Sequence, residues 1–297
     1  MVETDHRPMM VASSTIRIAP PPHRAHLAAG RIALARAALD DCVFCAHRCH
    51  VDRNRGEVGK CHAGSEARVF LSQTEVADEL ELIPTFAVAL SGCDLRCSFC
   101  ITGLQSWNPS AGVQFNAREI AERAERAIAR GARTIMLLGG EPTIHLPSVL
   151  ELISSLGFRT RLVWKTNGHG TAEARDFLDG LFDVWLVDYK FGNDTCAARL
   201  AAIENYNVIV RENLVWSHQH SELIVRHLLM PGHIECCWEP VAQWLSANLP
   251  GVKVSLRSGF WPAWQARRMP ELIRTTTHSE YSVARKIAID YGLNLIP

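Results

Sequence analysis

The sequence lacks several features that would place the chain in a membrane or on an export route. No apolar run approaches the ~20 residues that span a bilayer, and residues 1–24 contain no apolar signal-peptide segment. There is also no excess charge, because 31 Lys and Arg balance 31 Asp and Glu. Composition therefore gives no electrostatic reason to expect nucleic acid or an acidic membrane surface as a partner. We expect a cytoplasmic protein without a membrane partner.

Length and composition allow one large catalytic domain or two small ones. The chain has 297 residues, of which 47% are hydrophobic, so a substantial core can form. No internal repeat or low-complexity tract divides it. We expect a flexible tail over residues 1–24, which hold three consecutive prolines, a cysteine-rich metal-binding extension over 25–83, and the main domain over 84–297. Within the extension, residues 27–40 predict a helix.

The main domain alternates between short apolar strands and helices. We expect strands at 86–90, 134–138, 161–165, 184–187, 223–229 and 252–256, and helices at 116–130, 146–156, 171–181, 195–205, 208–217, 236–248 and 279–291. Such alternation predicts an α/β protein with a parallel sheet, either an open doubly wound sheet or a barrel. Polar residues follow several strand ends, as in barrel enzymes, whereas a doubly wound sheet concentrates its site at one switch point. We therefore predict a partial (β/α)6 TIM-like barrel.

Ten cysteines require an explanation, because disulfides are uncommon in a reducing cytosol. Seven of them fall between Cys42 and Cys100, and such clustering indicates metal binding. Cys196, Cys236 and Cys237 lie alone or as an adjacent pair in the second half of the chain. We interpret these three as small buried hydrophobic residues.

The most specific motif is a C-x3-C-x2-C stretch formed by Cys93, Cys97 and Cys100. Three thiolates within eight residues can bind one corner of an iron–sulfur cubane and leave the fourth iron without a protein ligand. An open metal position is what catalysis requires. A three-ligand zinc site or incidental thiols are the alternatives, but zinc sites more often show paired C-x2-C units.

This motif, with the aromatic Phe99 before the last cysteine, resembles the signature of the radical S-adenosylmethionine (SAM) superfamily. Later motifs extend the resemblance over roughly residues 84–297, and some of them resemble the pyruvate formate-lyase activating enzyme group. The resemblance implies SAM contacts from residues at or just after the ends of successive strands. These residues are Gly139, Gly140, Glu141, Thr166, Asn167, Asp188, Lys190, Arg226 and His227.

The resemblance also implies a reaction. SAM binds the open iron of a [4Fe-4S] cluster, one electron cleaves it, and the 5′-deoxyadenosyl radical abstracts a substrate hydrogen. A low-potential donor of the flavodoxin or ferredoxin type would supply the electron. The substrate would be a small molecule or a peptide. One alternative is an activase that installs a glycyl radical on a partner enzyme, and another is a non-catalytic iron–sulfur electron carrier.

A second cysteine group precedes the main domain. Cys42, Cys45, Cys49 and Cys61 form a closed set of four thiolates, which suits a second [4Fe-4S] cluster or a structural zinc. We favour the cluster. The neighbouring histidines His47, His50 and His62 could substitute as ligands. This group resembles that of activating-enzyme-like radical SAM proteins of unassigned substrate.

Several of these residues also have purely structural interpretations. Glu141 could be a charge at a helix N-terminus, Asp188 and Lys190 could form an ordinary ion pair, and His227 could be a hydrogen-bonded core residue. The aromatic residues Trp107 and 260–264 could form a lid or wall of the substrate cavity, or simply pack against the barrel end.

Overall fold

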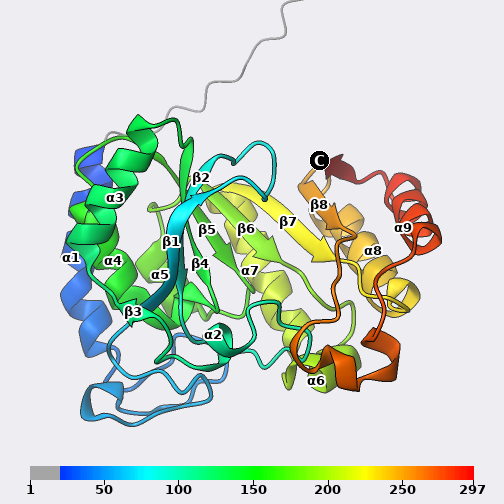
Figure 1. Ribbon diagram of the computed structural model, residues 1–297, viewed down its shortest axis with the longest axis horizontal. Helices are drawn as coiled ribbons and strands as arrows, with labels where there is room; N and C mark the ends of the chain where they lie inside the picture. Colours follow the sequence, from blue (N-terminus) through cyan, green and yellow to red (C-terminus); the bar gives the residue numbers. More distant parts are fainter. Residues whose placement is uncertain (1–20) are drawn as a thin grey trace, which may run out of the picture.

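The computed structural model describes residues 21–297 (Figure 1). The tail expected over residues 1–24 therefore lies, up to residue 20, outside the described part. The strands are β1 (Arg68–Glu75), β2 (Thr85–Leu90), β3 (Val113–Gln114), β4 (Thr134–Gly139), β5 (Arg161–Thr166), β6 (Val184–Asp188), β7 (Glu222–Leu228), β8 (Lys253–Arg257) and β9 (Asn294–Ile296). The helices are α1 (Pro21–Ala37), α2 (Leu104–Trp107), α3 (Ala117–Ala129), α4 (Leu146–Ser155), α5 (Ala172–Leu178), α6 (Asp194–Ala201), α7 (Tyr206–His220), α8 (Glu239–Asn248) and α9 (His278–Asp290). A π-helical turn (Ile234–Trp238) precedes α8, and short 3-10 turns cover Arg53–Arg55, Pro142–His145, Trp264–Arg268 and Pro270–Leu272.

All strands belong to one sheet of order β3-β1-β2-β4-β5-β6-β7-β8-β9. From β2 to β9 every neighbouring pair is parallel, whereas β1 pairs antiparallel with both β2 and β3. The six strands expected from the sequence are the parallel strands β2 and β4 to β8. The predicted partial (β/α)6 TIM-like barrel is confirmed, since an incomplete ring of parallel strands carries its helices on the outside (Figure 1).

Two apolar layers lie on the two faces of this sheet. Alternate strand residues point to opposite faces, so Ile135 and Trp164 pack beneath the outer helices. Met136 and Val163, their neighbours in sequence, instead join a separate cluster on the inner face with Leu82. Leu82 comes from the loop between β1 and β2, and that loop therefore fills part of the barrel interior.

Side-chain caps account for the N-terminal ends of several helices. Asn116 caps α3, because its side-chain oxygen accepts a hydrogen bond from Glu119 N (3.1 Å). At α9, Thr277 and Glu280 form a reciprocal capping box.

Three strands extend the sheet beyond the six that the sequence predicts. β1 and β3 lie at one edge, and the three-residue β9 lies at the other. The segment expected as a cysteine-rich extension, 25–83, thus supplies β1 to the sheet and packs α1 along α4. β1 escaped detection because its residues alternate poorly: one of its eight positions is buried.

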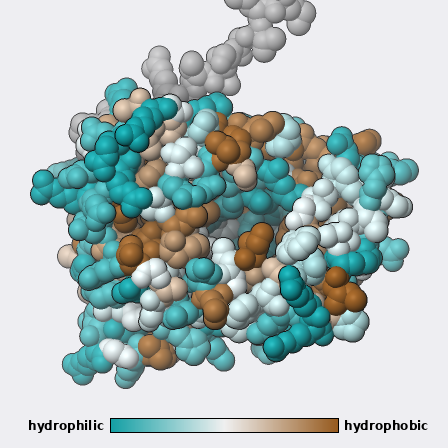
Figure 2. All heavy atoms as spheres, in the orientation of Figure 1, coloured by the Kyte–Doolittle hydropathy of each residue, from teal (hydrophilic) through white to brown (hydrophobic). Residues whose placement is uncertain are grey.

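The surface drawn in Figure 2 is mostly hydrophilic, with hydrophobic side chains in small separate groups and a hollow near the centre of this face. Among the described helices, none combines the length and the apolar character needed to cross a bilayer.

Candidate active site

The loop that carries Cys93, Cys97 and Cys100 follows β2 at the carboxyl edge of the sheet. Backbone hydrogen bonds tie this loop to the end of α6, from Arg96 N to Ala201 O (3.0 Å) and from Ser98 N to Leu200 O (2.8 Å). Cys93 and Cys97 are buried and Cys100 is half-buried. Helix α6 therefore fixes the backbone from which the three thiols project.

The thiols open into a cavity of about 330 Å³, which is within the usual size range of ligand pockets. All of the residues expected at the cluster and SAM sites line it except His227. These are Cys93, Cys97, Phe99, Cys100, Gly139, Gly140, Glu141, Thr166, Asn167, Asp188, Lys190 and Arg226. The ends of β4, β5, β6 and β7 thus converge on the cysteine loop, as the barrel hypothesis requires.

His227 faces away from this cavity, because neighbouring residues in a strand point to opposite faces and Arg226 points inward. The His227 Nδ1 atom lies 2.7 Å from Tyr189 O, and its ring packs on Trp238 with centroids 5.0 Å apart. Burial lowers the pKa of His227 to about 4. It is therefore a neutral, hydrogen-bonded core residue and not a cavity residue.

Burial raises the pKa of the Cys93 thiol well above its ordinary value, and the Asp94 charge adds to this effect. Burial also raises the pKa of Cys97 to about 12, although the Lys190 charge opposes the shift. Coordination to a cationic metal centre favours the thiolate form. Two buried thiols and the half-buried thiol of Cys100, beside an open cavity, therefore fit a three-thiolate cluster with one free iron.

The glycine pair after β4 allows two backbones to approach closely. Gly140 N donates to Leu90 O (2.8 Å) and Glu141 N donates to Gly92 O (2.9 Å). A Cβ atom on Gly139 would collide with the Leu90 backbone, and one on Gly140 would collide with the Gly92 carbonyl. Gly139 also has a φ of +139°, which favours glycine. The pair thus packs the end of β4 against the start of the cysteine loop.

Glu141 is buried and accepts four hydrogen bonds from the protein. Its Oε1 atom accepts from Thr143 N (3.1 Å), Thr143 Oγ1 (2.6 Å) and Thr166 Oγ1 (2.8 Å), and Oε2 accepts from Asn167 N (2.8 Å). Burial, reinforced by the Asp94 charge, raises the pKa of Glu141 to about 7. Glu141 also caps the 3-10 turn at Pro142. The carboxylate therefore joins the ends of β4 and β5.

Asp94, between two of the loop cysteines, is the centre of a second buried network. Its carboxylate accepts from Asn167 Nδ2 (2.7 Å) and pairs with His169 Nδ1 (2.7 Å). Burial raises the pKa of Asp94, but the hydrogen bonds from His169 and Asn167 outweigh it, and the net pKa is below the ordinary value. His47, from the cysteine-rich segment, reaches Asp94 O at 3.1 Å. Asp94 therefore connects the cysteine loop, the end of β5 and the N-terminal cysteine group.

One charged residue that the sequence did not single out, Asp78, contacts two side chains that line the cavity. Asp78, in the β1–β2 loop, accepts from Lys165 Nζ (2.6 Å) and Arg226 Nη1 (2.7 Å). Asp188 pairs with Lys190, as the structural interpretation of these two residues expects, and both still line the cavity. Asp78 was missed because only the path of its loop, and no local pattern, brings it into the barrel.

The four N-terminal cysteines also come together. Cys42, Cys45, Cys49 and Cys61 all line one small cavity against Ile144. Two of these sulfurs accept hydrogen bonds. Arg53 Nη1 donates to Cys42 Sγ (3.6 Å), and Lys60 N donates to Cys49 Sγ (3.4 Å).

Two of the histidines among these cysteines have other partners: His47 reaches Asp94, and the exposed His50 pairs with Asp41 at 2.8 Å. The group therefore fits a metal centre with four thiolate ligands. It docks on the loop after β5, where Ala46 N donates to His169 O (3.0 Å).

One of the aromatic residues expected at the barrel end lines the cavity. Trp261 forms part of its wall and is 58% exposed, whereas Trp107 packs against Trp264 with ring centroids 5.6 Å apart. The wall interpretation therefore holds for Trp261 and the packing interpretation for Trp107 and Trp264.

The three later cysteines are buried or half-buried in the core, as interpreted from the sequence, but the structure adds that they lie together. Cys196, Cys236 and Cys237 gather around His233, and their ligand atoms all lie within 4.8 Å of one another. The missed signal is the spacing of His233, Cys236 and Cys237 at i, i+3 and i+4, which places the three on one face of a helix.

Known proteins show where this chain belongs. A family model described as the Radical SAM superfamily matches residues 88–245. An uncharacterized protein of Methanocaldococcus jannaschii, MJ0674, is 31% identical over 276 residues, which make up 90% of this chain and 79% of that protein. A 7-carboxy-7-deazaguanine synthase of Methanothermobacter thermautotrophicus is 38% identical over 103 residues, or 35% of this chain and 40% of that enzyme.

Among solved structures, a radical SAM methyltransferase from Sphaerobacter thermophilus has the same fold, with a TM-score of 0.52 at 16% identity. The match covers 70% of this chain and 64% of that one.

Proposed function

The chain belongs to the radical SAM superfamily, and we propose that its cavity holds a SAM-cleaving [4Fe-4S] cluster which acts on a small polar molecule. A [4Fe-4S] cluster and SAM follow from membership of the superfamily. The observation that carries the proposal is the convergence of the three cysteines and four strand ends on one cavity.

We assign the cluster to Cys93, Cys97 and Cys100, which leave one iron free for SAM. When bound, the reduced cluster supplies the electron that cleaves SAM, and SAM supplies the radical that abstracts hydrogen. Phe99 and the backbone of Gly139 and Gly140 form the cavity surface beside the cysteines. These residues orient the cofactor and exclude water from it.

The substrate proposal is supported by the charge around the cavity. The cations Lys165, Lys190 and Arg226 line it together with Asp188. Because Lys190 and Arg226 each have hydrogens beyond those used in their ion pairs, they can also bind an anionic group of a substrate. The volume suits a small molecule better than a folded segment. The 7-carboxy-7-deazaguanine synthase relative, which is named for a small-molecule product, agrees with this choice.

For the N-terminal cysteines we propose a second [4Fe-4S] cluster. In a cubane each thiolate binds a different iron, whereas four ligands of one zinc ion lie close together. Elsewhere among the described residues, some groups of metal-ligand side chains have all their ligand atoms within 4.8 Å of one another. The ligand atoms of Cys42, Cys45, Cys49 and Cys61 are not gathered that closely, which favours the cluster over zinc. A flavodoxin or ferredoxin type donor would reduce the enzyme.

The test is reductive SAM cleavage by the anaerobically reconstituted chain. We expect 5′-deoxyadenosine from the parent and none from the Cys93/Cys97/Cys100→Ala variant, since among the described residues no other cysteine lines the cavity. Ser98→Ala in the same loop is the matched control, because its side chain does not line the cavity. Cleavage by the triple variant at the parent rate would refute the cluster assignment.

Substrate class is tested separately, by screening for compounds that stimulate 5′-deoxyadenosine formation. We expect stimulation by small anionic molecules. A glycyl radical, detected by electron paramagnetic resonance on an added glycyl-radical enzyme, would instead favour the activase alternative.

A further inference from the structure

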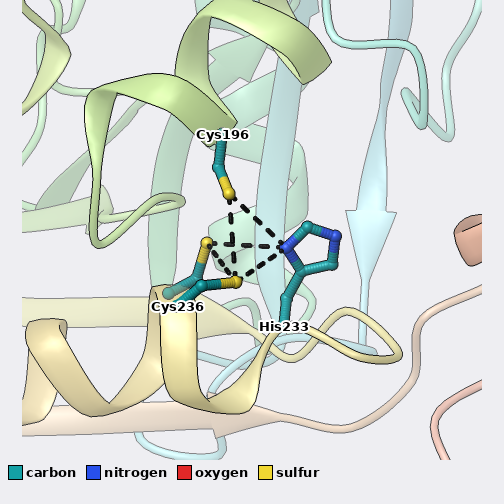
Figure 3. Close-up of side chains that lie close together, drawn as sticks. Cys196, His233 and Cys236 are labelled. Carbon is teal, nitrogen blue, oxygen red and sulfur yellow. Dashed lines mark hydrogen bonds between the residues drawn. The ribbon is translucent and has the colours of Figure 1, made fainter.

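A third group of metal-ligand side chains lies outside the cavity, between α6 and the turn after β7 (Figure 3). Cys196 comes from α6, and Cys236 and Cys237 come from the π-helical turn that His233 precedes. Cys196, Cys237 and His233 are buried, and Cys236 is half-buried. In Figure 3 the sulfurs of Cys196 and Cys236 point toward the ring nitrogen of His233.

The distances within the group match the edges of a tetrahedron around one ion. The Sγ atom of Cys236 lies 3.9 Å from those of Cys196 and Cys237. His233 Nδ1 lies 3.3 Å from Cys236 Sγ and 3.7 Å from each of the other two sulfurs. Zn–S bonds of about 2.3 Å and Zn–N bonds of about 2.0–2.1 Å give tetrahedral edges of about 3.8 Å between sulfurs and about 3.6 Å between sulfur and nitrogen.

Local structure explains how two consecutive cysteines reach the same point. In the π-helical turn both Cys237 N (3.1 Å) and Trp238 N (3.2 Å) donate to His233 O, so the turn is wider than in an α-helix. The i, i+3 and i+4 spacing then brings His233 and both cysteines to one side.

Cys196 is held by Asn193, the N-cap of α6, which accepts from Cys196 N (2.8 Å) and donates to Cys196 Sγ (3.3 Å) and Cys236 O (2.5 Å). Asn193 thus orients one sulfur and also bonds to the π-helical turn that holds the other two. Hydrogen bonds of this kind, which orient the ligands, are typical of the residues around a metal site.

Two other uses of these thiols fit the geometry less well. Sulfurs 3.9 Å apart are far beyond the disulfide bond length of about 2.05 Å. A cubane needs thiolates spread over separate irons, whereas these ligand atoms all lie within 4.8 Å of one another.

From these observations we propose that Cys196, His233, Cys236 and Cys237 bind one tetrahedral zinc ion. All four coordination positions are filled by protein and the group is largely buried, so the site is structural. The ion joins α6, whose end holds Arg96 and Ser98 of the cysteine loop, to the segment after β7. The ion would therefore stabilise the position of α6, and through α6 that of the cysteine loop.

The test is zinc analysis and X-ray absorption spectroscopy on the full chain, reconstituted anaerobically with iron, sulfide and zinc. We expect about one zinc per chain with three sulfur neighbours and one nitrogen neighbour. His233→Ala should lose this zinc, and His233→Cys should keep it with four sulfur neighbours. Because the parent spectrum alone distinguishes this site from the four N-terminal cysteines, the test still applies if His233→Ala fails to fold.

Three results would overturn the proposal: a parent without zinc, zinc with four sulfur neighbours only, or full zinc retention by His233→Ala. Thiol mapping that finds a disulfide among the three cysteines in anaerobic protein would also overturn it. The proposal stands or falls independently of the cluster assignment, since the Cys93/Cys97/Cys100→Ala variant should still contain this zinc.

Discussion

Replacing Glu141 by Gln tests whether this carboxylate mainly holds the strand ends together or mainly binds SAM. A carboxylate offers about four acceptor positions. Protein donors already make four hydrogen bonds to it, three to Oε1 and one to Oε2 from Asn167 N, so a ligand can use at most the one acceptor position left on Oε2. The structure therefore predicts a large effect on stability and a smaller one on SAM affinity.

The magnitude follows from the contacts. In Glu141→Gln the amide oxygen can replace Oε1, but the amide NH2 group then faces Asn167 N and leaves that buried donor without an acceptor. Such a group costs about 1–3 kcal/mol, and the remaining hydrogen bonds lose their charge assistance. A total of about 2–4 kcal/mol corresponds to a melting temperature lower by about 3–7 °C for a domain of this size.

The assay is anaerobic thermal unfolding, with iron content and SAM affinity measured on the same preparation. Glu173→Gln is the matched control, since Glu173 forms an exposed pair with Arg48 and should cost less than about 1 kcal/mol. A direct ion pair with the SAM amine would predict a ten- to hundred-fold loss of affinity, or about 1.5–3 kcal/mol. Unchanged melting with such a loss would refute the structural role.

Three further predictions follow from other parts of the molecule. Asp94→Ala should destabilise the chain by about 3–5 kcal/mol in anaerobic unfolding, because it strands buried partners such as His169; an unchanged melting temperature would contradict this. Hydrogen bonds from Lys253 and the nearby Arg161 charge outweigh burial and lower the pKa of Glu222. The charged Glu222 carboxylate therefore stabilises the fold above its unfolded pKa, and this contribution is lost as pH falls through its folded pKa. The melting-temperature advantage of the parent over Glu222→Gln should accordingly shrink from pH 6 to pH 4. A constant advantage would exclude this linkage. Removing the zinc ligand in His233→Ala should lower the melting temperature by several degrees and speed iron loss on dilution, since zinc binding stabilises the folded state; parent-like melting would argue against a supporting role.

The sequence was sufficient for features that depend on neighbours along the chain. The alternation of strands and helices depends on local periodicity, so the parallel strands β2 and β4 to β8 and their helices were predicted closely. The open thiolate spacing of Cys93, Cys97 and Cys100 lies within eight residues. Because the carboxyl ends of parallel strands share one edge, Gly140, Asn167 and the other strand-end residues could be expected at one cavity.

A position near a strand end does not by itself show whether a side chain points into the cavity, because neighbouring residues in a strand face opposite sides of the sheet. Arg226 and His227 are adjacent in one motif, yet one lines the cavity and the other packs on Trp238. Deciding between them requires the inner and outer faces of β7 to be known. The same holds for Glu141, whose role depends on donors contributed by Thr166 and Asn167 on the next strand.

Only the tertiary structure decided the contacts between distant segments. Asp78 meets Lys165 and Arg226 because the β1–β2 loop enters the barrel, and neither residue lies near it in sequence. Cys196 meets His233 and Cys236 across 37 and 40 residues, because α6 packs beside the turn after β7. Sequence spacing shows which ligand types are present and which of them share one face of a helix. Whether ligands from two helices or loops come together depends on how these elements pack on the sheet.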